Sequence, residues 1–199
     1  MTTIDSVVYP TYRFGMVQEE IYRGGYPKQR NIPFLKRLDL KTIISLTPNP
    51  VDIVDLLNNE GSGNHNNRDS VINKLDLKLN TIENKNNNID PISNNGNESQ
   101  IQYIHIKTDK PKEDNIPISF SKINQILLLL IDTNNYPIYI HCLDGSIVTS
   151  LVILCFRKLQ CWPLQASLAE AGRFLKDDNL TNEESLFIEK YPGDFGNYN

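Results

Sequence analysis

Cys142 stands where a short apolar run passes into a longer one, within residues 141–149. The run 137–140 is β-branched and aromatic and suits a buried strand, and residues 147–159 have the length of a buried helix. A strand that turns into a helix aims backbone N–H groups and the positive end of the helix dipole at the turn. We therefore predict that this turn, which we call the Cys142 loop (141–149), is an anion site that holds a thiol.

The Cys142 loop resembles the phosphate loop of the cysteine phosphatases, whose pattern is His-Cys-x-x-Gly-x-x-Arg-Ser/Thr. Val148 takes the place of the arginine, and the positions that match the pattern are His141, Cys142, Gly145 and Thr149. The variable positions hold Leu143, Asp144, Ser146 and Ile147. The resemblance implies that Cys142 occupies the nucleophile position and that the loop has lost its anion clamp.

Three further segments resemble the plant and fungal atypical dual-specificity phosphatases: residues 20–27, 31–48 and 157–162. The similarity covers about residues 17–191, and within the family it is greatest to the fungal oxidant-induced cell-cycle-arrest proteins. Active members of the family are associated with hydrolysis of inositol pyrophosphates and phosphotyrosine. The resemblance implies a cysteine-phosphatase fold of the dual-specificity type and a hetero-oligomer with paralogous phosphatase-like proteins.

Two departures from the pattern predict that hydrolysis is impaired. In an active loop the cysteine attacks phosphorus as a thiolate, and the arginine pairs with the phosphoryl oxygens in the transition state. Loss of a single preorganised donor costs roughly 10² to 10³ in rate, and Val148 supplies no donor. Asp144 adds a carboxylate, and two like unit charges about 5 Å apart repel by roughly 3 kcal/mol at an effective dielectric constant near 20.

The nucleophile and the general acid are affected as well. A thiol ionises near neutral pH beside positive charge or a helix N-terminus, and here only the helix remains, so Cys142 is expected to be mostly a thiol at pH 7. Segment 107–113 lies where phosphatases cover their site, and Asp109 and Glu113 are the two possible general acids. Possible donors in place of the missing arginine are Arg23, Lys110 and Arg173.

Several of these residues have structural alternatives. His141 is expected to orient the loop through backbone hydrogen bonds. Arg23 could reach an anion or pair with a nearby acid, and the lysines of segment 107–113 could meet a phosphorylated ligand or form a solvated loop. Cys155 could capture an oxidised Cys142, although its apolar surroundings favour core packing. No spacing of His, Cys, Asp or Glu predicts a metal site, and no cofactor is predicted.

The composition fits a cytoplasmic protein of one domain. The 199 residues are 39% hydrophobic and 22% charged, which is ordinary for a globular protein. We expect no leader and no membrane span, and three cysteines without a framework favour a reducing compartment. The net charge of −4 gives no general attraction to nucleic acid or acidic membranes, so any phosphate affinity has to be local.

Asparagine is dense and apolar residues are sparse from about residue 58 to residue 100. Such a segment cannot bury enough apolar surface to offset its ordering entropy, so we predict a disordered insertion within a single domain that covers residues 1–199. Residues 71–79 inside it are amphipathic and could form a short helix that meets a partner, or a transient helix without function.

Around this insertion the sequence alternates between strand and helix patterns. Strands are predicted at 20–23, 42–46, 102–106 and 137–141, and helices at 32–38, 51–58, 118–132, 146–160, 163–176 and 182–190. Thr181 and Glu184 form a capping box before the last helix. This order favours an α/β fold with a short, mainly parallel sheet flanked by helices.

These observations leave two functional hypotheses. The first is a pseudophosphatase that binds a phosphorylated ligand or a paralogous partner without hydrolysis. The second is a weakly active phosphatase that uses Cys142 as its nucleophile on phosphotyrosine or an inositol pyrophosphate. Turnover that depends on Cys142 distinguishes the second from the first.

Overall fold

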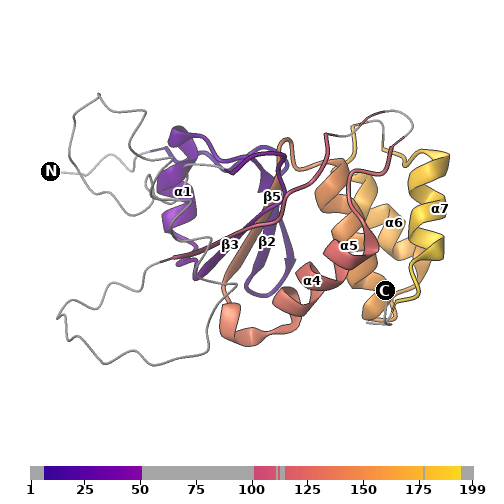
Figure 1. Cartoon of the computed structure of the whole chain (residues 1–199). Helices are drawn as coiled ribbons and strands as arrows, with labels where there is room; N and C mark the ends of the chain where they lie inside the picture. Colours follow the sequence, from indigo (N-terminus) through magenta and orange to yellow (C-terminus); the bar gives the residue numbers. More distant parts are fainter. Residues whose placement is uncertain (1–6, 51–100, 111, 113–114, 177, 194–199) are drawn as a thin grey trace, which may run out of the picture. The chain divides into compact units, whose positions relative to one another are not determined.

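In the computed structural model, five strands form one mixed sheet in the order β1-β2-β5-β3-β4 (Figure 1). The structure describes residues 7–50, 101–110, 112, 115–176 and 178–193, and all of these belong to one compact unit. The predicted helix at 51–58, the predicted insertion at about 58–100 and Glu113 lie outside the described residues.

The parallel part of the sheet places the Cys142 loop at the end of a central strand. Its strands are β2 (Ile21–Gly25), β3 (Thr42–Ser45), β4 (Gln102–His105) and β5 (Ile138–Cys142), and each falls at a predicted strand. β5 pairs in parallel with β2 on one side and with β3 on the other, and all of its residues are buried. In parallel sheets of this kind ligands bind beyond the carboxyl ends of the strands, which is where the Cys142 loop lies.

β1 (Gly15–Gln18) is a strand that the sequence does not predict. It pairs antiparallel with β2 at the edge of the sheet, with Gly15 opposite Arg23. Only Val17 of its residues is buried, and Met16 is 65% exposed. An edge strand with one buried side chain lacks the alternation of apolar and polar residues by which strands are recognised.

Helices lie on both sides of the sheet. Figure 1 shows α1 (Ile32–Lys36) on one side, with α4 (Phe120–Ile131), α5 (Ile147–Leu159), α6 (Leu164–Gly172) and α7 (Asn182–Lys190) on the other. Each falls within a predicted helix, but α6 ends earlier than predicted, at Gly172, a residue type that disfavours helix interiors. The capping box of α7 is confirmed, because Thr181 and Glu184 exchange hydrogen bonds between side chain and backbone N–H.

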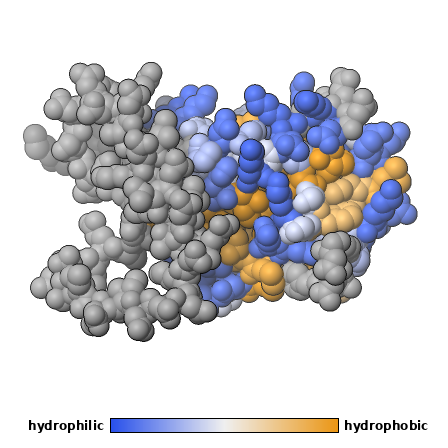
Figure 2. All heavy atoms as spheres, in the orientation of Figure 1, coloured by the Kyte–Doolittle hydropathy of each residue, from blue (hydrophilic) through white to orange (hydrophobic). Residues whose placement is uncertain are grey.

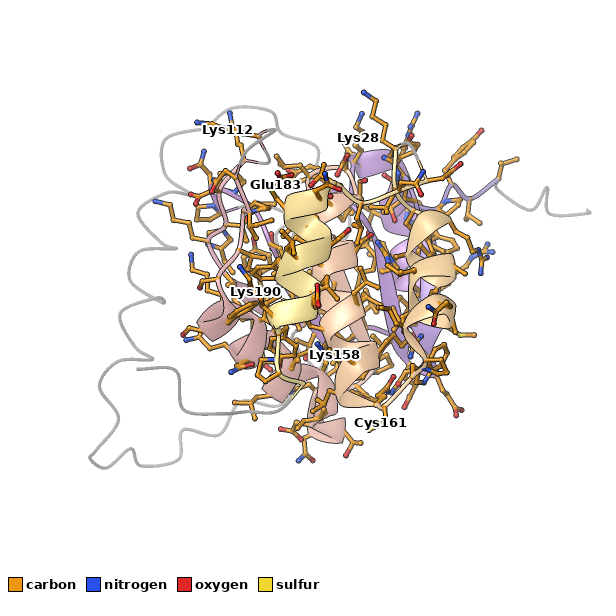
Figure 3. All side chains as sticks on the ribbon, turned by 90° about the vertical axis from the view of Figure 1, so that its right-hand side faces the viewer. Lys28, Lys112, Lys158, Cys161, Glu183 and Lys190 are labelled. Atoms are coloured by element: carbon orange, nitrogen blue, oxygen red, sulfur yellow. The ribbon has the colours of Figure 1, made fainter. Side chains whose placement is uncertain are left out.

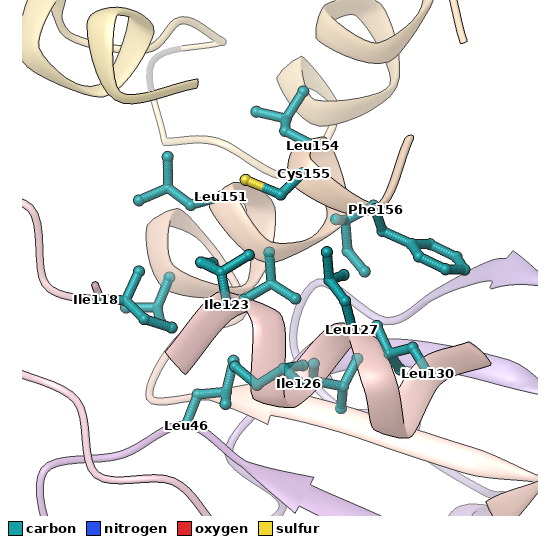
Figure 4. Packing of buried hydrophobic residues seen from close by; sticks show 14 of the residues in the cluster. Leu46, Ile118, Ile123, Ile126, Leu127, Leu130, Leu151, Leu154, Cys155 and Phe156 are labelled. Carbon is teal, nitrogen blue, oxygen red and sulfur yellow. The ribbon is translucent and has the colours of Figure 1, made fainter. Parts of the chain in front are cut away.

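The main core lies between the sheet and helices α4 and α5 (Figure 4). The apolar side chains that α4 buries there are Ile123, Ile126, Leu127 and Leu130, which recur at helical spacing. Cys155 of α5 belongs to the same cluster and is fully buried, which confirms its interpretation as a packing residue. A smaller cluster on the other side of the sheet joins α1 to β3 and β5, through Ile32, Leu35, Ile43 and Tyr139.

The surface carries mixed polar and apolar side chains. On the face seen in Figure 2, hydrophilic residues surround patches of hydrophobic ones, and apolar surface is also visible on the side where α6 and α7 lie. The large exposed apolar residues in this part of the chain include Trp162, Leu164 and Leu186. None of the helices in the described ranges is long and apolar enough to cross a membrane.

Candidate functional site

The Cys142 loop joins the central strand to a long helix. β5 ends at Cys142 and α5 begins at Ile147, so the N-terminus of a helix of 13 residues points at the loop. Gly145 has a φ of 74°, in the left-handed region that favours glycine. A Cβ at this position would also lie 2.7 Å from backbone atoms of Gly24 and Gly25. The glycine of the pattern is therefore needed both for the turn and for close packing of the loop on the end of β2.

The residues that precede β1 are anchored where β2 ends, on the same side of the sheet as the Cys142 loop. The backbone N–H of Gly25 donates to the carbonyl oxygen of Tyr12 at 2.7 Å. The buried hydroxyl of Tyr139 lies 2.7 Å from both the Thr11 hydroxyl and the Gly25 carbonyl oxygen. These bonds hold the segment that contains Tyr12 against the end of β2, where the Cys142 loop also packs.

The Cys142 side chain is buried at the base of the loop and is 2% exposed. Burial raises the pKa of its thiol above the ordinary value of 9.0, and the negative charge of Asp144 acts in the same direction. Hydrogen bonds with Thr149 and Gly145 lower the pKa but do not compensate for burial. The protonated thiol is therefore the expected form at neutral pH, in agreement with the sequence analysis.

Val148 turns its side chain into the core. It is 3% exposed and belongs to the cluster between the sheet and helices α4 and α5. Its neighbour Ile147 packs partly buried against the same cluster. The basic residues of α5, Arg157 and Lys158, lie in its last turn, at the opposite end from the loop. The first turn of α5 therefore supplies backbone N–H groups to the loop but no cationic side chain.

Arg23 lies under the loop and is 1% exposed. Its Nη2 donates to the carbonyl oxygen of Gly145 at 2.9 Å and to the hydroxyl of Ser150 at 2.8 Å. Its guanidinium also stacks on Phe174, with 3.9 Å between Cζ and the ring centroid. Burial lowers the pKa of Arg23 to about 10, so the side chain remains a cation at neutral pH. Of the two alternatives for Arg23, pairing with an acid is wrong, since the hydrogen bonds of its Nη2 go to the loop backbone and to α5. Its Nε and Nη1 are buried without a hydrogen-bond partner among the described residues.

Asp144 brings its carboxylate into the loop, and Arg13 is its counter-ion. The Oδ1 atom of Asp144 accepts a hydrogen bond from the Ser146 backbone N–H at 3.0 Å, and the Cys142 Sγ atom lies 3.8 Å from the same oxygen. Nη1 of Arg13 lies 3.6 Å from Oδ2 of Asp144 and 3.3 Å from its carbonyl oxygen. Arg13 is not predicted from the sequence, and the signal that points to it is the need of the added carboxylate for a cation.

His141 is fully buried between two tyrosines. Its ring stacks on Tyr139 with centroids 5.7 Å apart and meets Tyr26 edge-on at 6.1 Å. Nδ1 lies 3.3 Å from the carbonyl oxygen of Cys142. Burial lowers the pKa of His141 to about 4, so the ring is neutral at pH 7. These contacts agree with the expected role of His141 in orienting the loop.

Two cavities flank Leu143 at the tip of the loop. The larger, of about 560 Å³, has Lys28, Arg30 and Asp144 among its lining residues. The smaller, of about 250 Å³, is lined by Lys110, one of the predicted substitute donors. Figure 3 shows Lys28 extending outward from the ribbon. The mouth of the loop is therefore locally basic although the chain carries a net charge of −4.

The general acid stays a prediction. Asp109 is exposed, and its backbone N–H donates to the carbonyl oxygen of Pro117 at 3.0 Å. Among the contacts of the described residues, none joins the Asp109 carboxylate to the Cys142 loop. Glu113, the other predicted acid, lies outside the described residues.

Arg173, the third predicted substitute donor, is not among the residues that line the two cavities at the loop. Arg173 lines a cavity of about 580 Å³ together with residues of α6 and α7, and no residue of the Cys142 loop contributes to it. Cys161 is exposed just beyond the end of α5, and Figure 3 shows it at the opposite end of the view from Lys28. Within the described part of the chain, no three His, Cys, Asp or Glu side chains gather in a way that could hold a metal ion.

Comparison with known protein families gives a match over nearly all of the chain. The family described as the tyrosine phosphatase family matches residues 7–61 and 60–197. The fungal protein OCA6 of Saccharomyces cerevisiae is 30% identical over 90% of this chain and 69% of its own length. Its name describes it as a tyrosine-protein phosphatase. Inositol diphosphatase DSP5 of Arabidopsis thaliana is 32% identical over 94% of this chain and 81% of its own length.

Solved structures confirm the predicted α/β fold. The core catalytic domain of the PP-IP phosphatase SIW14 from S. cerevisiae, solved with citrate, superposes with a TM-score of 0.65 and 28% identity. This similarity covers 94% of this chain and 90% of that domain. TpbA of P. aeruginosa shares the fold at a TM-score of 0.57 and 18% identity, over 92% of this chain and 87% of its own.

Proposed function

This chain belongs to the tyrosine phosphatase family, as its sequence predicts, and we propose that it binds a phosphorylated ligand in the Cys142 loop without efficient hydrolysis. The loop keeps the parts that hold an anion by its backbone, namely the turn at Gly145 and the N-terminus of α5. It lacks the arginine of the pattern, which stabilises the transition state by charge, because position 148 is a valine. Binding and turnover are therefore separated in this member of the family.

The packing of Val148 is the observation that carries this proposal. At the position of the pattern's arginine, a valine that is 3% exposed lies in the apolar core. An arginine that pairs with the phosphoryl oxygens contributes donors and a full charge where negative charge develops, and valine contributes neither. Arg23 does not take its place in this geometry, because the side chain is 1% exposed and its Nη2 is directed to Gly145 and Ser150 beneath the loop.

The state of Cys142 supports the same conclusion. The attacking species in cysteine phosphatases is the thiolate. Burial and the carboxylate of Asp144 raise the pKa of the Cys142 thiol, so the reactive form is scarce at neutral pH. A phosphate group that enters the loop would therefore meet a protonated sulfur and no cationic clamp at position 148.

A weakly active phosphatase is the second candidate, and one observation favours it. Cys142 still lies at the N-terminus of α5, within reach of the backbone N–H groups that would hold a phosphoryl group. Relatives of the chain are named inositol diphosphatases, so an inositol pyrophosphate or phosphotyrosine would be its substrate. In this second candidate function the Cys142 thiolate attacks phosphorus and the P–O bond to the leaving group breaks, with a proton going to the leaving oxygen. Water then attacks the phosphocysteine, breaks the P–S bond, and releases inorganic phosphate and the free thiol.

The first prediction concerns the repair of the loop. We expect wild type to hydrolyse p-nitrophenyl phosphate or an inositol diphosphate no faster than Cys142→Ser. Val148→Arg, combined with Asp144→Lys to restore the charge of the loop, should gain at least about 10²-fold in rate. Val148→Met is the matched control, because it adds a long side chain without donors. Phosphate release is the measurement, and near-UV circular dichroism confirms that each variant is folded.

Turnover by wild type that disappears in Cys142→Ser would reject the proposal in favour of the weakly active enzyme. A covalent phosphocysteine trapped on Cys142 of the wild-type protein would have the same meaning, and mass spectrometry of the acid-quenched reaction detects it.

The hetero-oligomer with paralogous phosphatase-like proteins also stays a proposal. A chain that binds phosphate without turnover has a simple use as a regulatory subunit of an active relative. Purification of the chain from native cells at its endogenous level, with identification of the proteins that copurify, tests this hetero-oligomer. Recovery of the chain alone, at the mass of its monomer, would argue against such an assembly.

A further inference from the structure

We propose that Arg13 is the anion-binding cation of the Cys142 loop, and that the Asp144 carboxylate occupies the loop in the free protein as an internal substitute for a tetrahedral oxyanion. This inference rests on the proposed function, because it specifies how the loop binds phosphate after the loss of its arginine. Arg13 lies outside the phosphate-loop pattern and 131 positions from Asp144 along the chain.

The carboxylate of Asp144 already occupies one of the backbone N–H groups that an anion would use in this loop. Its Oδ1 atom accepts the backbone N–H of Ser146, one of the groups at the N-terminus of α5, at 3.0 Å. The same oxygen lies 3.8 Å from the Cys142 Sγ atom, which is the atom that a phosphoryl group would approach. An external anion must therefore displace this carboxylate before it can use the Ser146 N–H.

The displacement is possible because Asp144 is exposed. Its side chain is 57% accessible to solvent, whereas the Cys142 thiol beneath it is buried. An exposed carboxylate can rotate into water at little cost, and an ion pair of this kind contributes little to stability. A phosphate dianion brings more charge and more acceptor oxygens to the same N–H groups than one carboxylate does.

Arg13 stays at the loop when the carboxylate leaves. Besides its contact with Oδ2, its Nη1 lies 3.3 Å from the backbone carbonyl oxygen of Asp144, and this contact does not depend on the side chain of Asp144. The guanidinium also stacks over the Tyr12 ring, with 4.5 Å between Cζ and the centroid. Only 14% of the Arg13 side chain is exposed. The cation is thus positioned before any ligand arrives.

The backbone around Arg13 is built for this position. Arg13 has a φ of 50°, in the left-handed region that a residue with a side chain rarely adopts. The bond between the Gly25 N–H and the Tyr12 carbonyl oxygen, together with the contact of Thr11 with Tyr139, holds the chain on either side of this strained point.

The charges around the loop favour an anion over the internal carboxylate. Lys28 and Arg30 line the cavity beside Asp144, and Lys110 lines the cavity on the other side of Leu143. With Arg13 these side chains place three cations around the Asp144 carboxylate and a fourth, Lys110, on the other side of Leu143. Arg23 is different, because it is buried and its Nη2 is already bonded to the loop carbonyl of Gly145.

Binding of inorganic phosphate tests the inference without any need for turnover. We expect Asp144→Asn to bind phosphate about fivefold to tenfold more tightly than wild type, because the competing charge is gone. Arg13→Gln introduced into Asp144→Asn should weaken binding about tenfold, through loss of charge-assisted hydrogen bonds. Isothermal titration calorimetry gives the affinities, and the amide signal of Ser146 in ¹⁵N NMR spectra reports whether phosphate reaches the loop.

The matched control is Arg37→Gln in the same Asp144→Asn background. Arg37 is an exposed arginine at the end of α1, so its loss changes the net charge by the same amount and should alter affinity by less than about twofold. Arg13→Lys keeps the charge without the paired donors, and its affinity should fall between those of Asp144→Asn and the double variant. This second variant keeps the test informative if Arg13→Gln disturbs the fold.

Two results would overturn the inference. The first is equal phosphate affinity for Arg13→Gln and Arg37→Gln in the Asp144→Asn background. The second is a Ser146 amide that phosphate does not shift in Asp144→Asn. Neither result bears on whether wild type hydrolyses phosphate esters. Conversely, turnover by wild type would reject the proposed function and leave the role of Arg13 as it is, so the two failures are distinguishable.

Discussion

Two arginines contact the backbone of the Cys142 loop, one from below and one from its rim. Arg23 is 1% exposed and donates to the carbonyl oxygen of Gly145, while Arg13 lies at the mouth and reaches the carbonyl oxygen of Asp144. Arg23 is surrounded by an aromatic ring, a hydroxyl and backbone, but Arg13 is paired with a carboxylate. The base of the loop therefore fixes its shape, and the rim holds an exchangeable charge.

This difference explains how the loop can lose its own arginine and still keep its shape. The turn is held by Arg23, by Gly145 and by the strand pairing of β5, none of which depends on residue 148. A valine at position 148 can then be absorbed into the core. The charge that an anion needs has to come from a different part of the chain, and the rim is where the structure provides it.

The largest expected effect is on the free energy of unfolding, when each of the two arginines is replaced by alanine. Arg23→Ala leaves the carbonyl oxygen of Gly145 and the hydroxyl of Ser150 buried without their donor, and it removes the packing on Phe174. We expect a loss of about 3 kcal/mol in the free energy of unfolding. Arg13→Ala breaks a pair whose carboxylate is exposed and should cost less than about 1 kcal/mol. Urea denaturation of both variants measures the difference.

Equal losses for the two variants would contradict the division between base and rim. Arg23→Met serves as a second variant, because it keeps most of the packing volume without the donors. If Arg23→Met is as stable as wild type, the hydrogen bonds to the loop are not what Arg23 contributes.

The base of the loop is largely predictable from sequence, and its rim is not. The strand before Cys142, the helix after it and the need for Gly145 all follow from residues within the loop and its immediate flanks, because apolar runs and turn residues act locally. The capping box at Thr181 is predictable for the same reason. In α6, by contrast, the apolar pattern continues past Gly172 although the helix does not.

Arg13 escapes prediction because its role depends on a contact between distant segments. The residue belongs to a turn before β1, and β1 itself has no periodic signal. The sequence predicts Arg23 as a possible anion-binding residue, since it lies at a strand end, but its burial and its partners assign it to the base. The sequence shows that Val148 has no hydrogen-bond donor in its side chain, but only the structure shows that this side chain lies in the core.

The buried His141 makes the stability of the protein depend on pH, and this effect belongs to the base of the loop and not to its rim. Its pKa is lowered by burial from 6.5 to about 4 in the folded protein, so the neutral ring contributes stability above pH 6.5. This contribution is lost as pH falls from 6.5 to 4, because the unfolded chain gains a proton on His141 and the folded chain does not. The total loss in the free energy of unfolding is at most about 3 kcal/mol. His141→Phe keeps a ring between Tyr139 and Tyr26 and removes the proton.

We therefore expect the free energy of unfolding of wild type to fall more steeply between pH 6.5 and pH 4.5 than that of His141→Phe. Denaturant titrations at a series of pH values measure the two slopes. Parallel curves would mean that His141 is not the buried neutral group that the geometry describes.

The smallest expected effect is on the reactivity of the Cys142 thiol, which lies between the base and the rim of the loop. The negative charge of Asp144 contributes to the raised pKa of Cys142, so Asp144→Asn should lower that pKa and speed alkylation by iodoacetamide at pH 7.5 about threefold to tenfold. Arg13→Gln should slow the reaction, because it leaves the carboxylate without its counter-ion. Mass spectrometry of the Cys142 peptide follows the rate, and the exposed Cys161 serves as an internal reference for the reagent.

The opposite signs of these two changes are what makes the measurement decisive. A change in access to the buried thiol could accelerate alkylation in either variant, but it would not make Asp144→Asn faster and Arg13→Gln slower. The pH–rate profile separates the two causes, because a shifted pKa moves the midpoint of the profile and altered access changes only its plateau. If both variants react faster with an unchanged midpoint, the rim controls entry to the loop and leaves the charge at the sulfur unchanged.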